Sequence, residues 1–145
     1  MNHPKVITVY EKSTGRVISS GISCIPDNPD ESFLPSGCAI LIGVDANPGS
    51  SYISNGVAVN MPPRPSEAHD FFYPTKQWVC NADKAWSLVR MQRDRKLKDT
   101  DWMVTKASET GSPIPTDWSS YRQALRDITT QTDPMNIVWP TPPSN

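Results

Sequence analysis

Residues 117–128 read DWSSYRQALRDI, and this stretch decides how the C-terminal half of the chain folds. Four large apolar side chains recur in it at steps of three, four and three residues: Trp118, Tyr121, Leu125 and Ile128. An α-helix completes one turn in about 3.6 residues, so this spacing places all four on one narrow side of a helix. We expect a helix over residues 116–130 whose apolar seam is covered by another segment or by a partner.

The residues around this helix define its ends. Thr116 and Asp117 have side-chain oxygens that accept hydrogen bonds from the free N–H groups of a first turn, so one of them is expected to cap the helix. Pro115 keeps the preceding chain out of the helix, and Pro134 prevents its continuation because proline has no backbone N–H.

A second helix is expected over residues 83–98, where Trp86, Val89 and Leu97 fall on the apolar face and basic residues occupy much of the remainder. A loop over residues 104–116, which contains one glycine and two prolines, is expected to join the two helices into a hairpin. Burying each large apolar side chain between them would contribute about 1.5–3 kcal/mol. Mutual packing therefore decides whether either helix forms, because each is marginal alone.

A Pro-rich strap follows the helices, with the sequence NIVWPTPP at residues 136–143. Its prolines hold the backbone near polyproline II at low entropic cost. In one interpretation the strap folds back over the helical hairpin with Trp139 as its anchor. In the other it is a preorganised segment that lies in an aromatic groove of another protein or subunit.

The first sixty residues are expected to form a small antiparallel β domain. Runs of β-rich residues alternate with turn residues, and the runs lie at 6–10, 16–22, 38–44, 51–53 and 57–59. Residues 61–69 begin with MPPRP, which cannot join a ladder, and are expected to form a linker. Residues 70–145 are expected to form a second domain with a β-hairpin at 71–79, the two helices and the strap. The predicted fold class is therefore α+β.

The charge balance limits the partners. The 145 residues carry 14 basic and 15 acidic side chains, so no overall field attracts nucleic acid or an acidic membrane. The run RMQRDRK at 90–96 is locally basic and is interpreted as a solvated helix face, with a nucleic-acid-binding helix as the alternative. No stretch approaches the ~18 apolar residues of a membrane span, and no leader pattern is visible. We expect neither nucleic acid nor membrane as a partner.

Catalytic chemistry is not indicated. His3 and His69 have no nucleophile motif or ligand spacing nearby, so both are expected to be solvated or in loops. Asp99 and Asp101 flank Thr100 and are interpreted as helix-end residues rather than as an acid–base pair.

The three cysteines are an odd number at spacings that match no zinc site: Cys24, Cys38 and Cys80. We expect three buried or half-buried free thiols in a reducing cytoplasm, with a single Cys24–Cys38 disulfide as the alternative. Neither a metal nor a cofactor is expected.

Residues 71–143 resemble the bacteriophage tail assembly chaperone family. The resemblance rests on four motifs in order: RDR at 93–95, TDW at 100–102, YRQALRDI at 121–128 and WP at 139–140. It implies a non-enzymatic protein of the host cytoplasm that helps to build a phage tail by contacting a tail-fibre, tail-tip or baseplate protein. A permanent structural component at the receptor-facing tip of the virion tail is the alternative, and a nucleic-acid-binding regulator is less favoured.

Eight residues are predicted to contact the partner: Trp102, Trp118, Tyr121, Arg122, Leu125, Arg126, Trp139 and Pro140. Tryptophan, tyrosine and arginine often carry much of the binding energy at protein interfaces. For the two arginines, pairing with Asp101 or Asp117 inside the hairpin is the preferred interpretation. The narrow seam also predicts that the chain self-associates.

Overall fold

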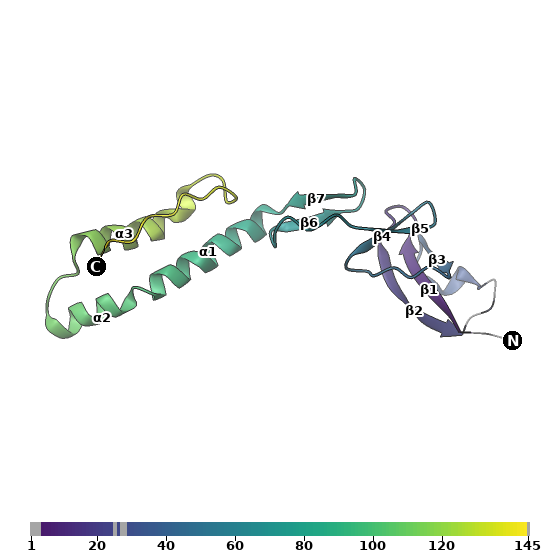
Figure 1. The fold of residues 1–145 in the computed structure, drawn as a ribbon, viewed down its shortest axis with the longest axis horizontal. Helices are drawn as coiled ribbons and strands as arrows, with labels where there is room; N and C mark the ends of the chain where they lie inside the picture. The colour runs from purple at the N-terminus through teal and green to yellow at the C-terminus, as the bar shows by residue number, and fades with distance from the viewer. Residues whose placement is uncertain (1–3, 25, 27–28, 145) are drawn as a thin grey trace. The chain divides into compact units, whose positions relative to one another are not determined.

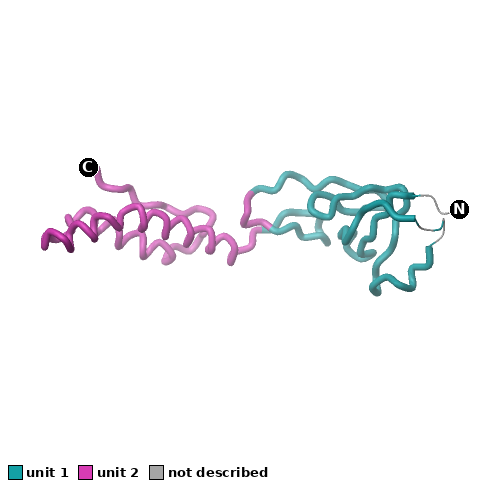
Figure 2. The backbone as a smooth tube through the Cα atoms, turned by 90° about the horizontal axis from the view of Figure 1, so that it is seen from below, with its two compact units in different colours: residues 1–65, 70–79 teal, residues 66–69, 80–145 magenta. Residues whose placement is uncertain are grey.

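The computed structural model describes residues 4–24, 26 and 29–144, which separate into two compact units (Figure 2). Unit 1 contains the chain up to residue 65 together with 70–79, and unit 2 contains 66–69 and the chain from residue 80 onward. The expectation for His3 lies outside the described residues. The predicted domain limits, 1–60 and 70–145, stay a prediction.

Unit 1 is built around a three-stranded antiparallel sheet in the order β2-β1-β3 (Figure 1). Its strands are β1 (Pro4–Glu11), β2 (Val17–Cys24) and β3 (Cys38–Ile42), and the 3-10 turn η1 (Glu31–Phe33) precedes β3. Thr8 on the central strand is fully buried, and its hydroxyl donates to the Val44 carbonyl at 2.7 Å. The buried polar group is thereby satisfied in the middle of the sheet.

A second sheet pairs β4 (Ser51–Ser54) with β5 (Val57–Asn60) through the predicted Asn-Gly turn. An isolated antiparallel bridge joins Arg16 to Tyr52, which brings this hairpin against the first sheet. Gly15 has a φ of +72°, and a Cβ there would lie 2.0 Å from the Ile53 carbonyl oxygen, so only glycine fits the contact. Val17 and Ile53 then pack together in the core of unit 1.

A third pair of strands, β6 (His69–Phe72) and β7 (Gln77–Cys80), carries an aromatic cluster of unit 1. The Phe71 ring lies 5.7 Å from Tyr52, 5.1 Å from Tyr73 and 5.2 Å from Trp78, measured between centroids. The predicted α+β class with small antiparallel sheets is confirmed. The three cysteines are free thiols, and Cys38 is buried. The expectation that all three are at least half-buried is wrong for Cys24 and Cys80, which are exposed.

Unit 2 contains the helices α1 (Ala82–Lys98), α2 (Asp101–Thr110) and α3 (Thr116–Arg126), followed by the 3-10 turn η2 (Asp127–Thr130). The helix α3 runs back beside α1, and the final segment of the chain runs beside α3 (Figure 1). The Asn81 side chain caps α1 by accepting the Lys84 N–H at 3.2 Å.

Two expectations about the helix predicted over residues 116–130 are wrong in detail. The α-helix ends at Arg126, and residues 127–130 continue as a 3-10 turn rather than as α-helix. Neither Thr116 nor Asp117 caps it, because Pro115 occupies the cap position and no side chain bonds to the first turn. Pro115 has φ −52° and ψ 139°, and its carbonyl accepts the Ser119 N–H at 3.0 Å, so the helix begins without a side-chain cap.

The expected loop at residues 104–116 is also wrong, because most of it is the helix α2. No glycine or proline interrupts residues 101–110, and the first helix-ending residue is Gly111, which adopts a φ of +64°. Only residues 111–115 are left to connect α2 to α3.

Candidate partner-binding site

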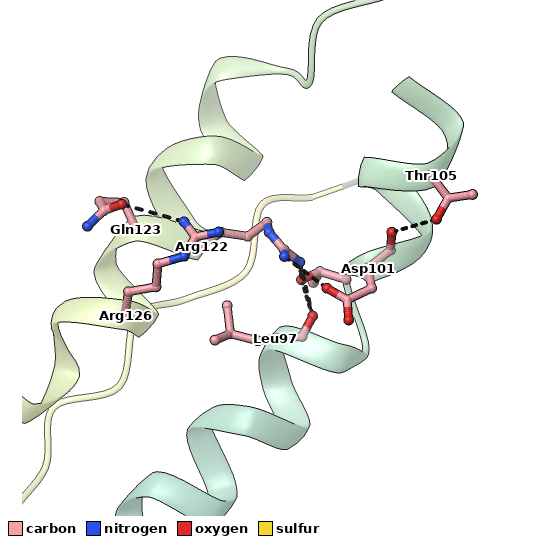
Figure 3. A network of polar contacts seen from close by, with 7 residues as sticks. Leu97, Asp101, Thr105, Arg122, Gln123 and Arg126 are labelled. Carbon is pink, nitrogen blue, oxygen red and sulfur yellow. Dashed lines mark hydrogen bonds and ion pairs between the residues drawn. The ribbon is translucent and has the colours of Figure 1, made fainter. Parts of the chain in front are cut away.

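One buried arginine joins the three helices of unit 2 (Figure 3). Arg122 on α3 is 8% exposed, and its Nη1 donates to the Leu97 carbonyl at the end of α1 at 3.0 Å. The same nitrogen donates to the Thr100 hydroxyl, and Nη2 donates to the Asp101 carboxylate at 2.9 Å. We call these four residues the arginine lock. The planar guanidinium presents two separate nitrogens to these three acceptors in a fixed geometry, whereas a lysine amine would donate from a single nitrogen.

The arginine lock coincides with the break between α1 and α2. Thr100 has φ −110° and ψ 2°, outside the helical range, and its hydroxyl donates to the Leu97 carbonyl at 2.8 Å. The last carbonyl groups of a helix carry partial negative charge, so the buried guanidinium also offsets the charge at the end of α1. The preferred interpretation of Arg122 as an intramolecular partner of Asp101 is confirmed.

The apolar seam of α3 is covered within unit 2. Leu125 is fully buried, Tyr121 is 7% exposed and Ile128 is 2% exposed, and α3 and η2 both contact α1. Trp118 is half-buried and meets the Tyr121 ring edge-on, with centroids 5.9 Å apart. Burial raises the pKa of the Tyr121 hydroxyl, and the nearby charge of Asp99 adds to the rise. Self-association through this seam stays a prediction.

A tight turn directs the strap back over the helices. The Asp133 carboxylate accepts the Met135 N–H at 2.9 Å and the Asn136 side-chain amide at 2.7 Å. These bonds hold the pKa of Asp133 below its usual range, the Asn136 bond being the larger cause. The Gln131 side chain then bonds both the N–H and the carbonyl of Val138, each at 2.9 Å.

Beyond this turn, the strap lies against two helices of the same unit. The Lys96 amine of α1 sits 5.4 Å from the centroid of the half-buried Trp139 ring. Trp139 and Ile137 line a cavity of about 260 Å³ together with α1 residues that include Val89. Further along, Pro143 and its neighbours lie against the side of α3 that carries Tyr121.

A second pocket lies on α2, largely within residues 104–116, which were expected to form a loop. It has a volume of about 310 Å³ and is lined by Trp102, Met103, Lys106, Ala107, Thr110, Ser112, Pro113 and Pro115. We call it the Trp102 groove. Trp102 is 53% exposed, and α2 has no buried residue at all. An exposed tryptophan beside two prolines is unusual for a solvated surface and typical of a binding site.

The structure thus divides the eight predicted contact residues by burial. Three are interior to unit 2: Tyr121, Arg122 and Leu125. Trp118, Trp139 and Pro140 are half-buried, and Trp102 and Arg126 are exposed. Arg126 makes a long bond of 3.5 Å to the Gln123 side chain and pairs with neither of the aspartates considered for it. That all eight contact a partner stays a prediction.

The groove residues around Trp102 were missed because a loop was expected there. Met103 and Ala107 lie one helical turn apart, and Trp102 and Lys106 have the same spacing, which was the available signal for a helix face.

In the described ranges, no cluster of three or more His, Cys, Asp or Glu side chains could hold a metal ion. Among the same residues, no helix is both long and apolar enough to span a bilayer.

Comparison with known protein families identifies a match in the C-terminal part of the chain. Residues 86–144 match the family described as phage tail assembly chaperone protein, which confirms the predicted resemblance over this segment. The segment is less than half of the chain, and it contains the arginine lock, the Trp102 groove and the strap. The match supports a role in phage tail assembly. No curated protein and no solved structure matched the chain.

Proposed function

We propose that this protein binds a tail-fibre or tail-tip protein of a phage while the tail is assembled in the host cytoplasm, and that it catalyses no reaction. The proposal rests mainly on one observation: the residues that match the family include both the Trp102 groove and the folded strap of unit 2. The matched residues include an exposed tryptophan in an apolar groove, which is the feature a protein partner would use.

The contact residues divide into two roles in this proposal. The buried members, Arg122 and Leu125, fix the packing of α3 against α1 and the position of α2. Trp102, together with the outer side of the strap at Trp139 and Pro140, meets the partner. Since α2 buries no residue of its own, its position depends on the arginine lock at its first residue. The lock therefore presents the groove to the partner.

The groove is suited to an apolar side chain of the partner. Its lining is mainly aromatic, aliphatic and proline carbon, and its polar members, such as Lys106 and Thr110, allow a few hydrogen bonds around the occupant. Removing a central tryptophan from an interface commonly costs about 2 kcal/mol or more, which corresponds to roughly thirtyfold in Kd. The prolines change little on binding because their backbone is already restricted.

The proposal is tested in infected cells and in purified virions. A tagged copy of the protein is expressed during infection, and the tail-fibre and tail-tip proteins that co-purify are quantified by mass spectrometry before lysis. The expected result is stoichiometric recovery of one of these two proteins. Recovery of neither, despite abundant tagged protein, would contradict the proposal. The same measurement on virions separates release after assembly from retention: retention selects the structural alternative at the tail tip.

A further inference from the structure

The three-stranded sheet of unit 1 has two outer strands, and their free edges differ. β2 and β3 lie on either side of β1, so each presents a row of backbone N–H and C=O groups away from the sheet (Figure 1). Such a row can pair with another strand, and proteins usually close it with a charge, a proline or a covering loop. In this sheet one edge is closed and the other is open.

The alternation of hydrogen bonds along β1 identifies the groups that point outward. The Gly43 N–H, just beyond the end of β3, donates to the Val6 carbonyl at 2.8 Å, so the even-numbered residues of β1 bond toward β3. The odd-numbered residues of β1 therefore bond toward β2, where Ile7 lies opposite Gly21. The outward backbone groups of β2 consequently belong to Ser20, Ile22 and Cys24.

The outer edge of β3 is closed by two hydrogen bonds. By the same alternation, Cys38 and Ile40 direct their N–H groups away from β1. The Ile40 N–H donates to the Glu31 carboxylate, and the Cys38 N–H donates to the Pro35 carbonyl, both at 3.1 Å. The bond from Ile40 is also the main reason why the pKa of Glu31 lies below its usual range. No strand can pair along β3 without breaking these bonds.

The outer edge of β2 has no such protection. Within the described part of the chain, the outward backbone groups of Ser20, Ile22 and Cys24 make no hydrogen bond. The strand reads VISSGISC, with neither a charged residue nor a proline, and the Ile22 side chain is 77% exposed. Only the beginning of this edge is covered, because Arg16 is bridged to Tyr52 of β4. The edge is therefore open from Ser20 to Cys24.

We propose that the open edge of β2 pairs with the same edge of a second copy of this chain, so that the two sheets become one continuous antiparallel sheet. Ile22 then lies opposite Ile22 of the partner subunit, and Ser20 lies opposite Cys24 of the partner subunit. In this register each outward N–H meets an outward carbonyl. Pro26, which has no N–H, ends the ladder before the second strand reaches β4.

Three features of the edge favour a second copy as its partner. Antiparallel pairing of identical strands brings identical residues together, which like charges would oppose, and this strand has no charge. Ile22 would be removed from water by its own copy, and Val6, opposite it on β1, continues the apolar row. Because the edge of β3 is closed, the pairing stops at a dimer with twofold symmetry. This surface is separate from the α3 seam, which is covered within unit 2.

The test measures the mass of the full chain by sedimentation equilibrium as its concentration rises. The contact is small, so the wild type is expected to form a weak dimer by about 1 mM. Ile22→Lys places like charges opposite each other and should weaken the dimer by about tenfold or more. Val57→Lys is the matched control and should leave the dimer unchanged. Val57 is a 60% exposed β-branched residue of β5 in the same unit, and its variant has the same change in charge.

A mixture of two variants tests the register. Ile22→Glu should weaken the dimer as Ile22→Lys does, because like charges again face each other. Mixing the two variants in equal amounts should restore a mixed dimer about tenfold tighter than either variant alone, since opposite charges then lie opposite each other. Circular dichroism checks that each variant is folded. A mixture of folded variants that stays monomeric, although the wild type forms a dimer, would overturn the proposed pairing.

Amide hydrogen exchange, followed by NMR, identifies the bonds that the dimer makes. The N–H groups of Ser20, Ile22 and Cys24 should gain protection as the dimer forms, whereas the Gly21 N–H, which faces β1, should be protected at every concentration. A wild type that remains monomeric at about 1 mM overturns the proposal. A dimer in which the three outward amides exchange freely does so as well.

Two further results separate this inference from its alternatives. A monomer whose outward amides become protected only when a tail-fibre or tail-tip protein is added would overturn the second copy and replace it with a strand of that protein. The tail-assembly function is tested independently, because Trp102→Ala should leave the dimer unchanged. Loss of the dimer in that variant would overturn the assignment to β2.

Discussion

The Arg122 guanidinium of α3 lies 2.9 Å from the Asp101 carboxylate at the first residue of α2, and the two side chains differ sharply in exposure. The Arg122 side chain is 9% exposed and the Asp101 side chain 61% exposed. The arginine is therefore held mainly by the buried acceptors at the end of α1, whereas the aspartate is largely solvated. The two partners of one ion pair should contribute unequally to stability.

Arg122→Ala should lower the free energy of unfolding of unit 2 by about 2–3 kcal/mol, because buried hydrogen bonds to a charged group are lost. Asp101→Ala should lower it by no more than about 1 kcal/mol, since an exposed ion pair is screened by solvent. Urea unfolding followed by tryptophan fluorescence measures both, because four of the five tryptophans, all except Trp78, lie in unit 2. Equal losses in the two variants would show that Arg122 acts only through Asp101.

Leu125→Ala should destabilise unit 2 by about 2–5 kcal/mol, because the side chain is fully buried and its removal leaves a cavity between α3 and α1. Gln123→Ala, two residues earlier and exposed, should change stability by about 0.5 kcal/mol or less. Thermal unfolding of the two variants compares them directly. A small effect of Leu125→Ala would mean that α3 does not pack against α1 in solution.

The turn that starts the strap should loosen in acid. The pKa of Asp133 is depressed in the folded chain, so its contribution to stability is present above the unfolded pKa and is lost as the pH falls through the folded value. The protection of amides 135–139 against hydrogen exchange, relative to their intrinsic rates, should therefore fall in acid, and Asp133→Ala should show this low protection already at neutral pH. Slow exchange in that variant would show that the Gln131 bonds to Val138 suffice to hold the turn.

A fragment of residues 66–145 should unfold cooperatively by itself, because its core is complete within unit 2. Ala68 belongs to this core with 2% exposure, and its carbonyl accepts the Asn81 N–H at 2.7 Å. A shorter fragment that begins at residue 82 loses both this contact and the Asn81 cap of α1. It should be less stable by about 1–2 kcal/mol, measured by urea titration.

The sequence predicts the elements that local patterns determine. The seam of α3 and the Asn-Gly turn were readable because periodicity and turn chemistry act over a few residues. The pairing of Arg122 with Asp101 was also accessible, as charge complementarity between two expected helix ends. These features can be predicted from residue type and spacing alone, without knowledge of any tertiary contact.

The α2 segment could not be placed in the same way. Its stability depends on the arginine lock, which assembles residues 97, 100, 101 and 122 from three helices, and no local pattern encodes that contact. The Trp102 groove was missed with it, since the groove exists only when residues 102–110 are helical. Burial of Tyr121 inside unit 2 likewise depends on long-range packing, so the seam alone did not reveal what covers it.

The central claim is that the exposed Trp102 groove, held in place by the interior of unit 2, binds a tail-fibre or tail-tip protein. Calorimetric titration of that protein with the wild type, Trp102→Ala and Val104→Ala tests it most directly. Val104 is an exposed apolar residue of the same helix outside the groove, so it controls for changes in helix stability. We predict that Trp102→Ala weakens binding by roughly thirtyfold while Val104→Ala leaves it unchanged. Equal affinity of the wild type and Trp102→Ala would contradict the claim.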